Sequence, residues 1–73
     1  MPETVHSHMN GSVNRIIVAP GDAIEDGSPL VILEAMNMEF AVMTEVAGVV
    51  VYLHVAEGDA VRPGQPLVDL STE

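Results

Sequence analysis

The hexapeptide Glu34-Ala35-Met36-Asn37-Met38-Glu39 (EAMNME) lies at the centre of the 73-residue chain and separates two similar halves. When residues 11–33 are shifted by 37 positions onto residues 48–70, twelve of the 23 aligned pairs are identical. Self-similarity at a fixed offset indicates a repeated supersecondary unit. The sequence therefore predicts one domain, residues 1–73, built from two copies of one unit. We expect the joining segment, residues 34–40, to form an exposed tip on or near a pseudo-twofold axis.

Each copy carries the pattern of short strands separated by glycine- and proline-containing turns. Residues 12–18 and 49–55 are rich in β-branched side chains, as is typical of strands. The apolar positions in these stretches are separated by an odd step, Val13 to Ile16 and Val50 to Leu53, which predicts a β-bulge in each copy. Gly21 is expected at a turn that requires positive φ. Seven or eight short strands without helices predict an all-β fold, a flattened barrel of two related halves.

The stretch from residue 33 to residue 45 also fits an amphipathic helix. It is rich in good helix formers, and Met36, Phe40 and Met43 fall at helical spacing. The repeat favours two strands instead, over residues 30–36 and 38–45, joined by a tight turn at Met36-Asn37. Asparagine suits such a turn because its short side chain tolerates the left-handed conformation. The helix remains the alternative.

The charge of the chain limits its partners. Eleven acidic residues face only two basic ones, Arg15 and Arg62, so the formal net charge is −9 and the chain contains no lysine. Nucleic acids and anionic membranes are therefore unfavourable partners, because both attract basic surfaces. The absence of cysteine excludes disulfides and thiolate metal sites. No apolar run approaches the ~20 residues of a membrane helix, and the N-terminus lacks a signal-peptide pattern, so we expect a cytoplasmic location.

The sequence shows no arrangement of side chains that would predict catalysis. No serine or cysteine nucleophile has a recognisable partner, and no glycine-rich phosphate loop opens a helix. His6 and His8 would share a face of a strand and could bind a metal weakly, but exposed histidines without a function are the favoured interpretation. His54 is distant in sequence and adds little to such a site. We therefore expect a non-catalytic chain.

The hexapeptide resembles the EAMKME attachment motif of biotin carboxyl carrier domains, the biotinyl branch of the biotinyl/lipoyl fold. The resemblance covers residues 9–70 and includes an M-x-G-x-V opening at Met9 and paired G-D turns at Gly21 and Gly58. It implies a barrel-sandwich hybrid without an inserted thumb, which acts as the carrier module of a biotin-dependent carboxylase.

The resemblance also implies partners and a recognition surface. The partners are a biotin protein ligase, a biotin carboxylase and a carboxyltransferase, and the isolated domain is expected to be a monomer. The residues that would be recognised around the attachment position are Glu34, Ala35, Met36, Met38 and Glu39. The two methionines could instead simply pack onto the sheet, and the two glutamates could be solvated surface charge.

The chain departs from the family at the attachment position itself, where Asn37 stands in place of the modified lysine. A carboxamide nitrogen is not a nucleophile, and no other lysine is present, so this chain is expected to carry no biotin. Asn37 is either a recent or deliberate replacement or the natural residue. The alternative functions are a docking module that never carries a cofactor and a lipoyl-type carrier. Methionines on both sides of the tip residue argue against the lipoyl type.

Overall fold

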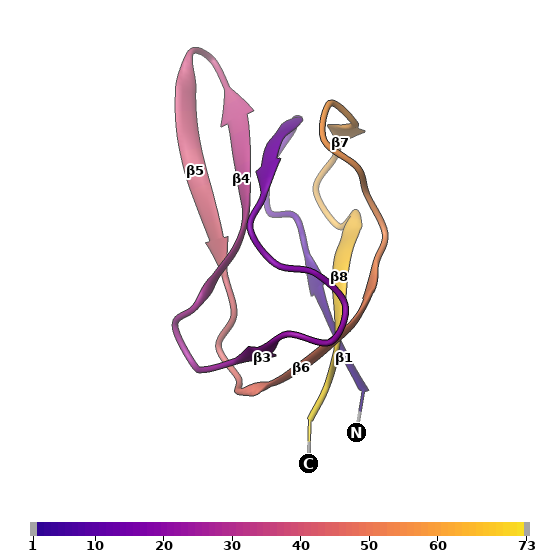
Figure 1. Ribbon diagram of the computed structural model, residues 1–73. Helices are drawn as coiled ribbons and strands as arrows, with labels where there is room; N and C mark the ends of the chain where they lie inside the picture. Colours follow the sequence, from indigo (N-terminus) through magenta and orange to yellow (C-terminus); the bar gives the residue numbers. More distant parts are fainter. Residues whose placement is uncertain (1, 73) are drawn as a thin grey trace.

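The computed structural model describes residues 2–72, which form eight β-strands (Figure 1). In chain order the strands are β1 (Pro2–His6), β2 (Gly11–Ile16), β3 (Ala23–Ile24), β4 (Pro29–Ala35), β5 (Met38–Met43), β6 (Gly48–Leu53), β7 (Ala60–Val61) and β8 (Pro66–Ser71). Residues 2–72 contain no helix, and thus none that is long and apolar enough to cross a membrane. The prediction of an all-β fold is confirmed.

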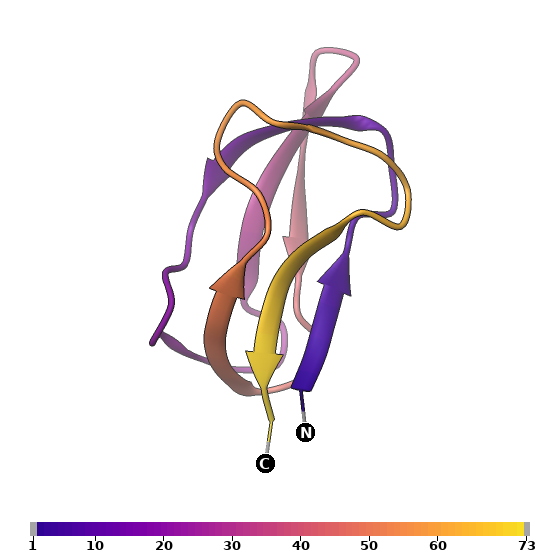
Figure 2. The ribbon, with the colours of Figure 1, turned by 90° about the vertical axis from the view of Figure 1, so that its right-hand side faces the viewer.

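The strands pair in two four-stranded antiparallel sheets, β1-β8-β6-β3 and β5-β4-β2-β7. The two long strands of the first half, β2 and β4, form the middle of one sheet, and those of the second half, β6 and β8, form the middle of the other. The short strand of each half, β3 or β7, pairs with the sheet of the other half. Figure 2 shows β6, β8 and β1 side by side on one face of the molecule. The exchange of the short strands interlocks the two halves.

The helix alternative for residues 33–45 is wrong, because β4 and β5 occupy this stretch. Helix propensity is a weak preference that tertiary pairing overrides. The predicted strand bounds, 30–36 and 38–45, were close to the observed Pro29–Ala35 and Met38–Met43. The predicted strand over residues 12–18 ends earlier, at Ile16, and the glycine- and proline-containing segments expected to be turns contain the short strands β3 and β7.

Both predicted β-bulges are present. The pairing of β2 with β4 skips Asn14, and the pairing of β6 with β8 skips Val51. A bulge places one extra residue in a strand and so shifts which side chains point inward. This explains how Val13 and Ile16, an odd number of positions apart, both face the core.

The core lies between the two sheets and is aliphatic. Four leucines of β4 and β8 are completely buried, and each pair is related by the offset of 37 residues: Leu30 with Leu67, and Leu33 with Leu70. Burying a leucine side chain stabilises the fold by roughly 1.5–3 kcal/mol. Val5 and Met9 pack against this core while remaining partly exposed. The repeated apolar positions therefore supply matching layers from both sheets.

The structural repeat is longer than the sequence repeat, because the β1–β8 pair copies the β5–β4 pair. In β5–β4, Glu39 lies opposite Glu34, and in β1–β8 the equivalent Pro2 lies opposite Ser71. The register continues in step along both pairs, and each shows an irregularity at its far end, between Val5 and His6 in one and between Pro29 and Val31 in the other. The two structural copies thus cover residues 2–35 and 39–72.

This longer repeat corrects the expected position of the tip. The pseudo-twofold relation superposes the β4–β5 pair on the β8–β1 pair. The turn that joins β4 and β5 therefore corresponds to the open end of the β8–β1 pair, near the two termini. Figure 1 shows that turn at one end of the molecule and both termini at the other end, and the longest dimension of the molecule is 36 Å. The tip therefore lies far from the axis, and the expectation that it lies on or near the axis was wrong.

Candidate functional site

The hexapeptide forms the closed end of the hairpin between β4 and β5. Ala35 pairs with Met38, which leaves only Met36 and Asn37 in the turn. Both turn residues have positive φ, 54° for Met36 and 64° for Asn37. Two-residue hairpin loops with φ > 0 at both positions match the right-handed twist of the strands. The left-handed conformation predicted for Asn37 is confirmed, whereas the same conformation at Met36 was not foreseen because methionine rarely adopts it.

The tip projects into solvent. The exposed fraction is 92% for Met36 and 59% for Met38, and Asn37 is also exposed. Packing onto the sheet therefore does not account for Met36. Large apolar side chains held this far out of the core are available to contact another molecule.

Two like charges face each other just below the turn. Glu34 and Glu39 are directly opposite across the hairpin, and both are exposed. Glu34 accepts a hydrogen bond from Asn14 Nδ2 at 3.4 Å. The ion pair recorded within residues 2–72 involves neither glutamate. Like charges directly opposite on neighbouring strands destabilise a sheet. The stability of the hairpin therefore does not explain why two glutamates face each other here.

The tip offers no amine. Asn37 ends in a carboxamide, which donates and accepts hydrogen bonds but does not act as a nucleophile. The two basic side chains of the chain are the guanidinium groups of Arg15 and Arg62. The N-terminal strand begins at the opposite end of the molecule, where Pro2 pairs with Ser71 (Figure 1). Within residues 2–72, no side-chain amine therefore lies at the tip.

An apolar groove runs beneath the tip along the inner side of β5, and the sequence did not reveal it. Its part nearest the tip encloses about 520 Å³, and its apolar lining comes from Met9, Ala35, Met36, Met38, Phe40 and Pro63. A second part of about 300 Å³ continues past Phe40 toward Met43. The alternation of Met38, Phe40 and Val42 was the available signal, since residues two apart on a strand share one face.

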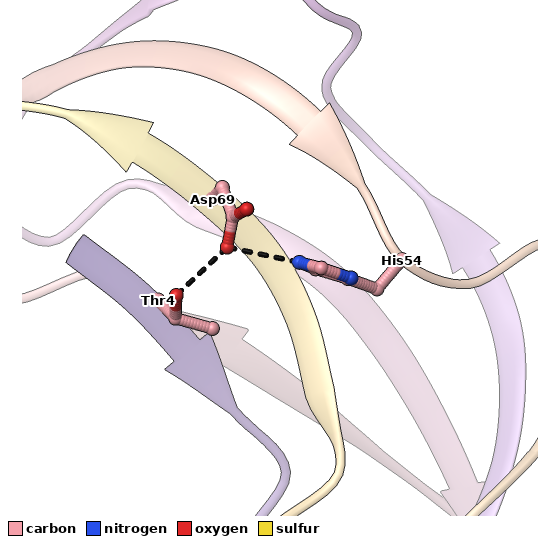
Figure 3. A network of polar contacts seen from close by, with 3 residues as sticks. All are labelled: Thr4, His54 and Asp69. Atoms are coloured by element: carbon pink, nitrogen blue, oxygen red, sulfur yellow. Dashed lines mark hydrogen bonds and ion pairs between the residues drawn. The ribbon is translucent and has the colours of Figure 1, made fainter. Parts of the chain in front are cut away.

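A polar network joins Thr4 of β1, Asp69 of β8 and His54, which follows β6, and so belongs to the sheet without the tip (Figure 3). Asp69 Oδ1 accepts a hydrogen bond from His54 Nε2 at 2.9 Å and another from Thr4 Oγ1 at 2.8 Å. The hydrogen bond from His54, and then that from Thr4, hold the pKa of Asp69 below its usual range. The Tyr52 ring meets the His54 ring edge-on, with centroids 4.9 Å apart.

The three histidines do not come together in a metal site. His54 is bound to Asp69, and His8 lies beyond the end of β1, which holds His6. Across residues 2–72 there is no group of three or more histidine, cysteine, aspartate or glutamate side chains that could hold a metal ion. The hydrogen bond between His54 and Asp69 was not foreseen, because it depends on the pairing of β6 with β8.

Comparisons with known proteins agree with this geometry. The family model described as "Biotin-requiring enzyme", which covers biotinyl and lipoyl attachment domains, matches residues 1–70. The chain is 44% identical over 50 residues to the "Biotinylated protein TB7.3 homolog" of Mycobacterium leprae, an alignment that covers 68% of this chain and 70% of that protein. It is 37% identical over 51 residues to the biotin carboxyl carrier protein of Streptococcus mutans, covering 70% of this chain and 39% of that protein.

Solved structures show the same fold within larger enzymes. The Kluyveromyces lactis urea carboxylase superposes with a TM-score of 0.91 at 28% identity, over 97% of this chain and 6% of that one. A single-chain, multi-domain long-chain acyl-CoA carboxylase superposes with a TM-score of 0.92 at 26% identity, over 99% of this chain and 7% of that one. This chain thus corresponds to a small part of each carboxylase. It belongs to the biotinyl/lipoyl attachment domain family and is a domain of the biotin carboxyl carrier type, a non-catalytic carrier part of carboxylases.

Proposed function

We propose that this domain is a carrier module of a biotin-dependent carboxylase in a form that cannot be biotinylated. The observation that carries the proposal is the position of Asn37, exposed at the end of a two-residue hairpin turn in a chain without lysine. This is the position at which the resemblance to carrier domains places the modified lysine.

Biotin does not fit the residues present at the tip. The family binds biotin covalently, which requires an amine that can attack an activated carboxyl group. The carboxamide of Asn37 lacks that reactivity, and its side chain is shorter than that of lysine by two atoms. The chemistry of the tip is therefore limited to contact with other molecules.

The surface offered for those contacts consists of the remaining residues of the hexapeptide, Glu34, Ala35, Met36, Met38 and Glu39. We propose that it is presented to a biotin protein ligase, and to the carboxylase and carboxyltransferase components of the parent system. The support is the exposure of the methionines and of Glu34 and Glu39, neither of which has an ion-pair partner within residues 2–72.

The variant Asn37→Lys tests this proposal. The turn already holds residue 37 in the geometry of the hairpin, so restoring the amine should restore the substrate of a biotin protein ligase. We expect the variant to be biotinylated, as detected by a streptavidin shift, and the unchanged chain to remain unlabelled. Failure of the variant to be labelled, under conditions in which an ordinary carrier is fully labelled, would contradict the proposal.

The same experiment separates a second candidate function, a docking module that never carries a cofactor. The complete absence of lysine favours this alternative. A tip that is not shaped for a ligase would leave Asn37→Lys unlabelled while the fold remains intact.

A further inference from the structure

Methionine side chains gather at the tip of the molecule. The chain has five methionines, and three of the four within residues 2–72 line the part of the groove nearest the tip, of about 520 Å³, which we call the tip pocket. These three are Met9, Met36 and Met38, and His8 lines the same pocket. Three thioether sulfurs and one imidazole therefore belong to residues around one small, solvent-accessible space.

Two segments that are distant in sequence bring these side chains together. Ser12, near the start of β2, lies opposite Glu34 near the end of β4. The approach is close at Gly11, where a Cβ would lie 2.6 Å from the carbonyl oxygen of Glu34. The residues that lead into β2, His8 and Met9 among them, therefore pass against the end of the hairpin that carries the other two methionines.

Hydrogen bonds fix the side of the pocket that carries His8 and Met9. The Ser7 hydroxyl accepts a hydrogen bond from Met9 N at 3.2 Å and donates one to Met9 O at 2.8 Å. Ser7 N donates to Gln65 O, and Gly64 N donates to Ser7 O, each at 2.8 Å. The backbone that carries the imidazole and the first thioether is thus held in one conformation, as a preformed ligand site requires.

The hairpin side of the pocket is open to solvent. Met36 and Met38, on either side of Asn37, have exposed fractions of 92% and 59%. A methionine side chain has three rotatable bonds and adapts its shape to what it contacts. Both thioethers can therefore turn toward the fixed side of the pocket, and an ion can reach them directly from water.

The chemistry of these donors selects the ion. Thioether sulfur is a soft ligand that favours monovalent copper, and imidazole also suits copper. Magnesium and calcium prefer oxygen ligands, and zinc is bound by cysteine, histidine and carboxylate groups, of which the tip pocket offers only His8. The chain has no cysteine that could compete for copper, and its net charge of −9 attracts cations.

The repeat shows that the fold does not require these donors. The offset of 37 residues relates His8 to Glu45 and Met9 to Val46, in a turn that Thr44 closes with the same two hydrogen bonds as Ser7. The equivalent turn therefore has neither a thioether nor an imidazole. The soft donors are confined to the copy of the turn that faces the tip.

We propose that the tip pocket binds one monovalent copper ion through three thioether sulfurs and one imidazole. The sulfurs are those of Met9, Met36 and Met38, and the imidazole is that of His8. The bound ion would join the start of β2 to the hairpin and order the exposed methionines. The inference does not rest on the carrier proposal, because neither biotin nor Asn37 supplies a donor.

A competition titration of the unchanged chain tests the proposal. Cu(I) is kept reduced by ascorbate in the absence of oxygen, and bicinchoninate serves as the competing chelator. We expect the chain to withdraw one equivalent of Cu(I) from the chelator, and an equal concentration of Zn(II) not to displace it. No withdrawal of copper, or displacement of the copper by zinc, would overturn the proposal.

Substitutions of single methionines locate the site. Met9→Leu, Met36→Leu and Met38→Leu each remove one sulfur and nearly conserve the side-chain volume. Each should weaken Cu(I) binding by about tenfold or more, because even the loss of an outer-shell partner typically costs 10–100-fold in metal affinity. The matched control is Met43→Leu, which removes a sulfur from the same hairpin outside the tip pocket and should leave the affinity unchanged.

Histidine variants form a second matched pair. His8→Gln should weaken Cu(I) binding, whereas His6→Gln, at a histidine that does not line the tip pocket, should not. Thermal unfolding confirms that each variant is folded. The proposal is wrong if the folded variants at positions 8, 9, 36 and 38 bind Cu(I) as tightly as the unchanged chain.

The methyl resonances of the methionines give an independent readout of the ligands. One equivalent of Cu(I) should shift the ε-methyl signals of Met9, Met36 and Met38 and leave that of Met43 in place. Equal shifts of all four signals would show scattered binding and would contradict the site. The carrier proposal is tested separately by the labelling of Asn37→Lys, so either conclusion can fail while the other stands.

Discussion

Ser7 and Thr44 lie 37 positions apart, and their buried hydroxyl groups make the same two hydrogen bonds. Ser7 Oγ donates to Met9 O at 2.8 Å and accepts from Met9 N at 3.2 Å. Thr44 Oγ1 donates to Val46 O at 2.7 Å and accepts from Val46 N at 3.0 Å. Each residue also accepts from a glycine at 2.8 Å through its carbonyl oxygen, Ser7 from Gly64 and Thr44 from Gly27. These bonds turn the chain at the end of β1 and of β5.

Removing either hydroxyl should destabilise the fold. Thr44→Val keeps the volume of the side chain but leaves the backbone groups of Val46 without their partner. We expect a loss of roughly 1–3 kcal/mol in the free energy of unfolding, and a similar loss for Ser7→Ala. Denaturant midpoints at equal m-values measure both. Ser28→Ala, which removes a solvent-exposed hydrogen bond from Glu25 N to the Ser28 hydroxyl, is the control and should cost less. Unchanged midpoints for Thr44→Val and Ser7→Ala would show that the paired bonds do not stabilise the turns.

Glycine and alanine at position 37 should affect the stability of the fold differently. Residue 37 has a φ of 64°, and glycine meets no Cβ penalty in that conformation. Asn37→Gly should therefore be within roughly 1 kcal/mol of the unchanged chain and more stable than Asn37→Ala. The comparison uses denaturant midpoints of the two variants. A more stable alanine variant would be inconsistent with a left-handed residue at the tip.

Asp69 should make the stability sensitive to acid. Its pKa is lowered in the folded chain by the hydrogen bonds from His54 and Thr4. Its contribution is therefore present above the pKa of the unfolded chain and is lost as the pH falls through the folded pKa. Between about pH 6 and about pH 3, the unchanged chain should lose more stability than Asp69→Asn does. Chemical denaturation across this range measures the difference. Parallel pH profiles for the two proteins would contradict the role assigned to Asp69.

Much of the fold could be predicted from the sequence because the core repeats. The inward positions, such as Leu30 and Leu67, are restricted to apolar side chains, so the two copies remain alike there. The bulges could also be predicted, since the step from Val13 to Ile16 has the wrong parity for a regular strand. The turn at Asn37 followed from the tolerance of asparagine for positive φ.

The first strand was harder to predict as part of the repeat. Between residues 2–10 and 39–47 only Val5 and Val42 are identical, and Ser7 and Thr44 are similar. β1 and β5 are edge strands with much of their surface in solvent, so few of their side chains are restricted. Without β1 in the repeat, the tip appeared to join two complete halves and was placed near the axis.

The groove and the network at Asp69 depend on pairing between distant strands. Met9 and Pro63 reach the tip only because β2 and β7 lie in the same sheet as the hairpin. His54 reaches Asp69 only because β6 pairs with β8. The alternation of Met38, Phe40 and Val42 indicates which residues share a face of β5, but it does not show that Met9 and Pro63 lie opposite them. The contact between His54 and Asp69 has no periodic signal at all.

The central claim, that the tip of this domain cannot take biotin, is tested most directly by intact mass. The chain is produced together with an active biotin protein ligase and excess biotin, and Asn37→Lys is produced in the same way as the positive control. We predict only the unmodified mass for the unchanged chain, and a mass increased by one biotinyl group for the variant. A biotin-sized increase in the unchanged chain, mapped by peptide analysis to residues 34–40, would contradict the account.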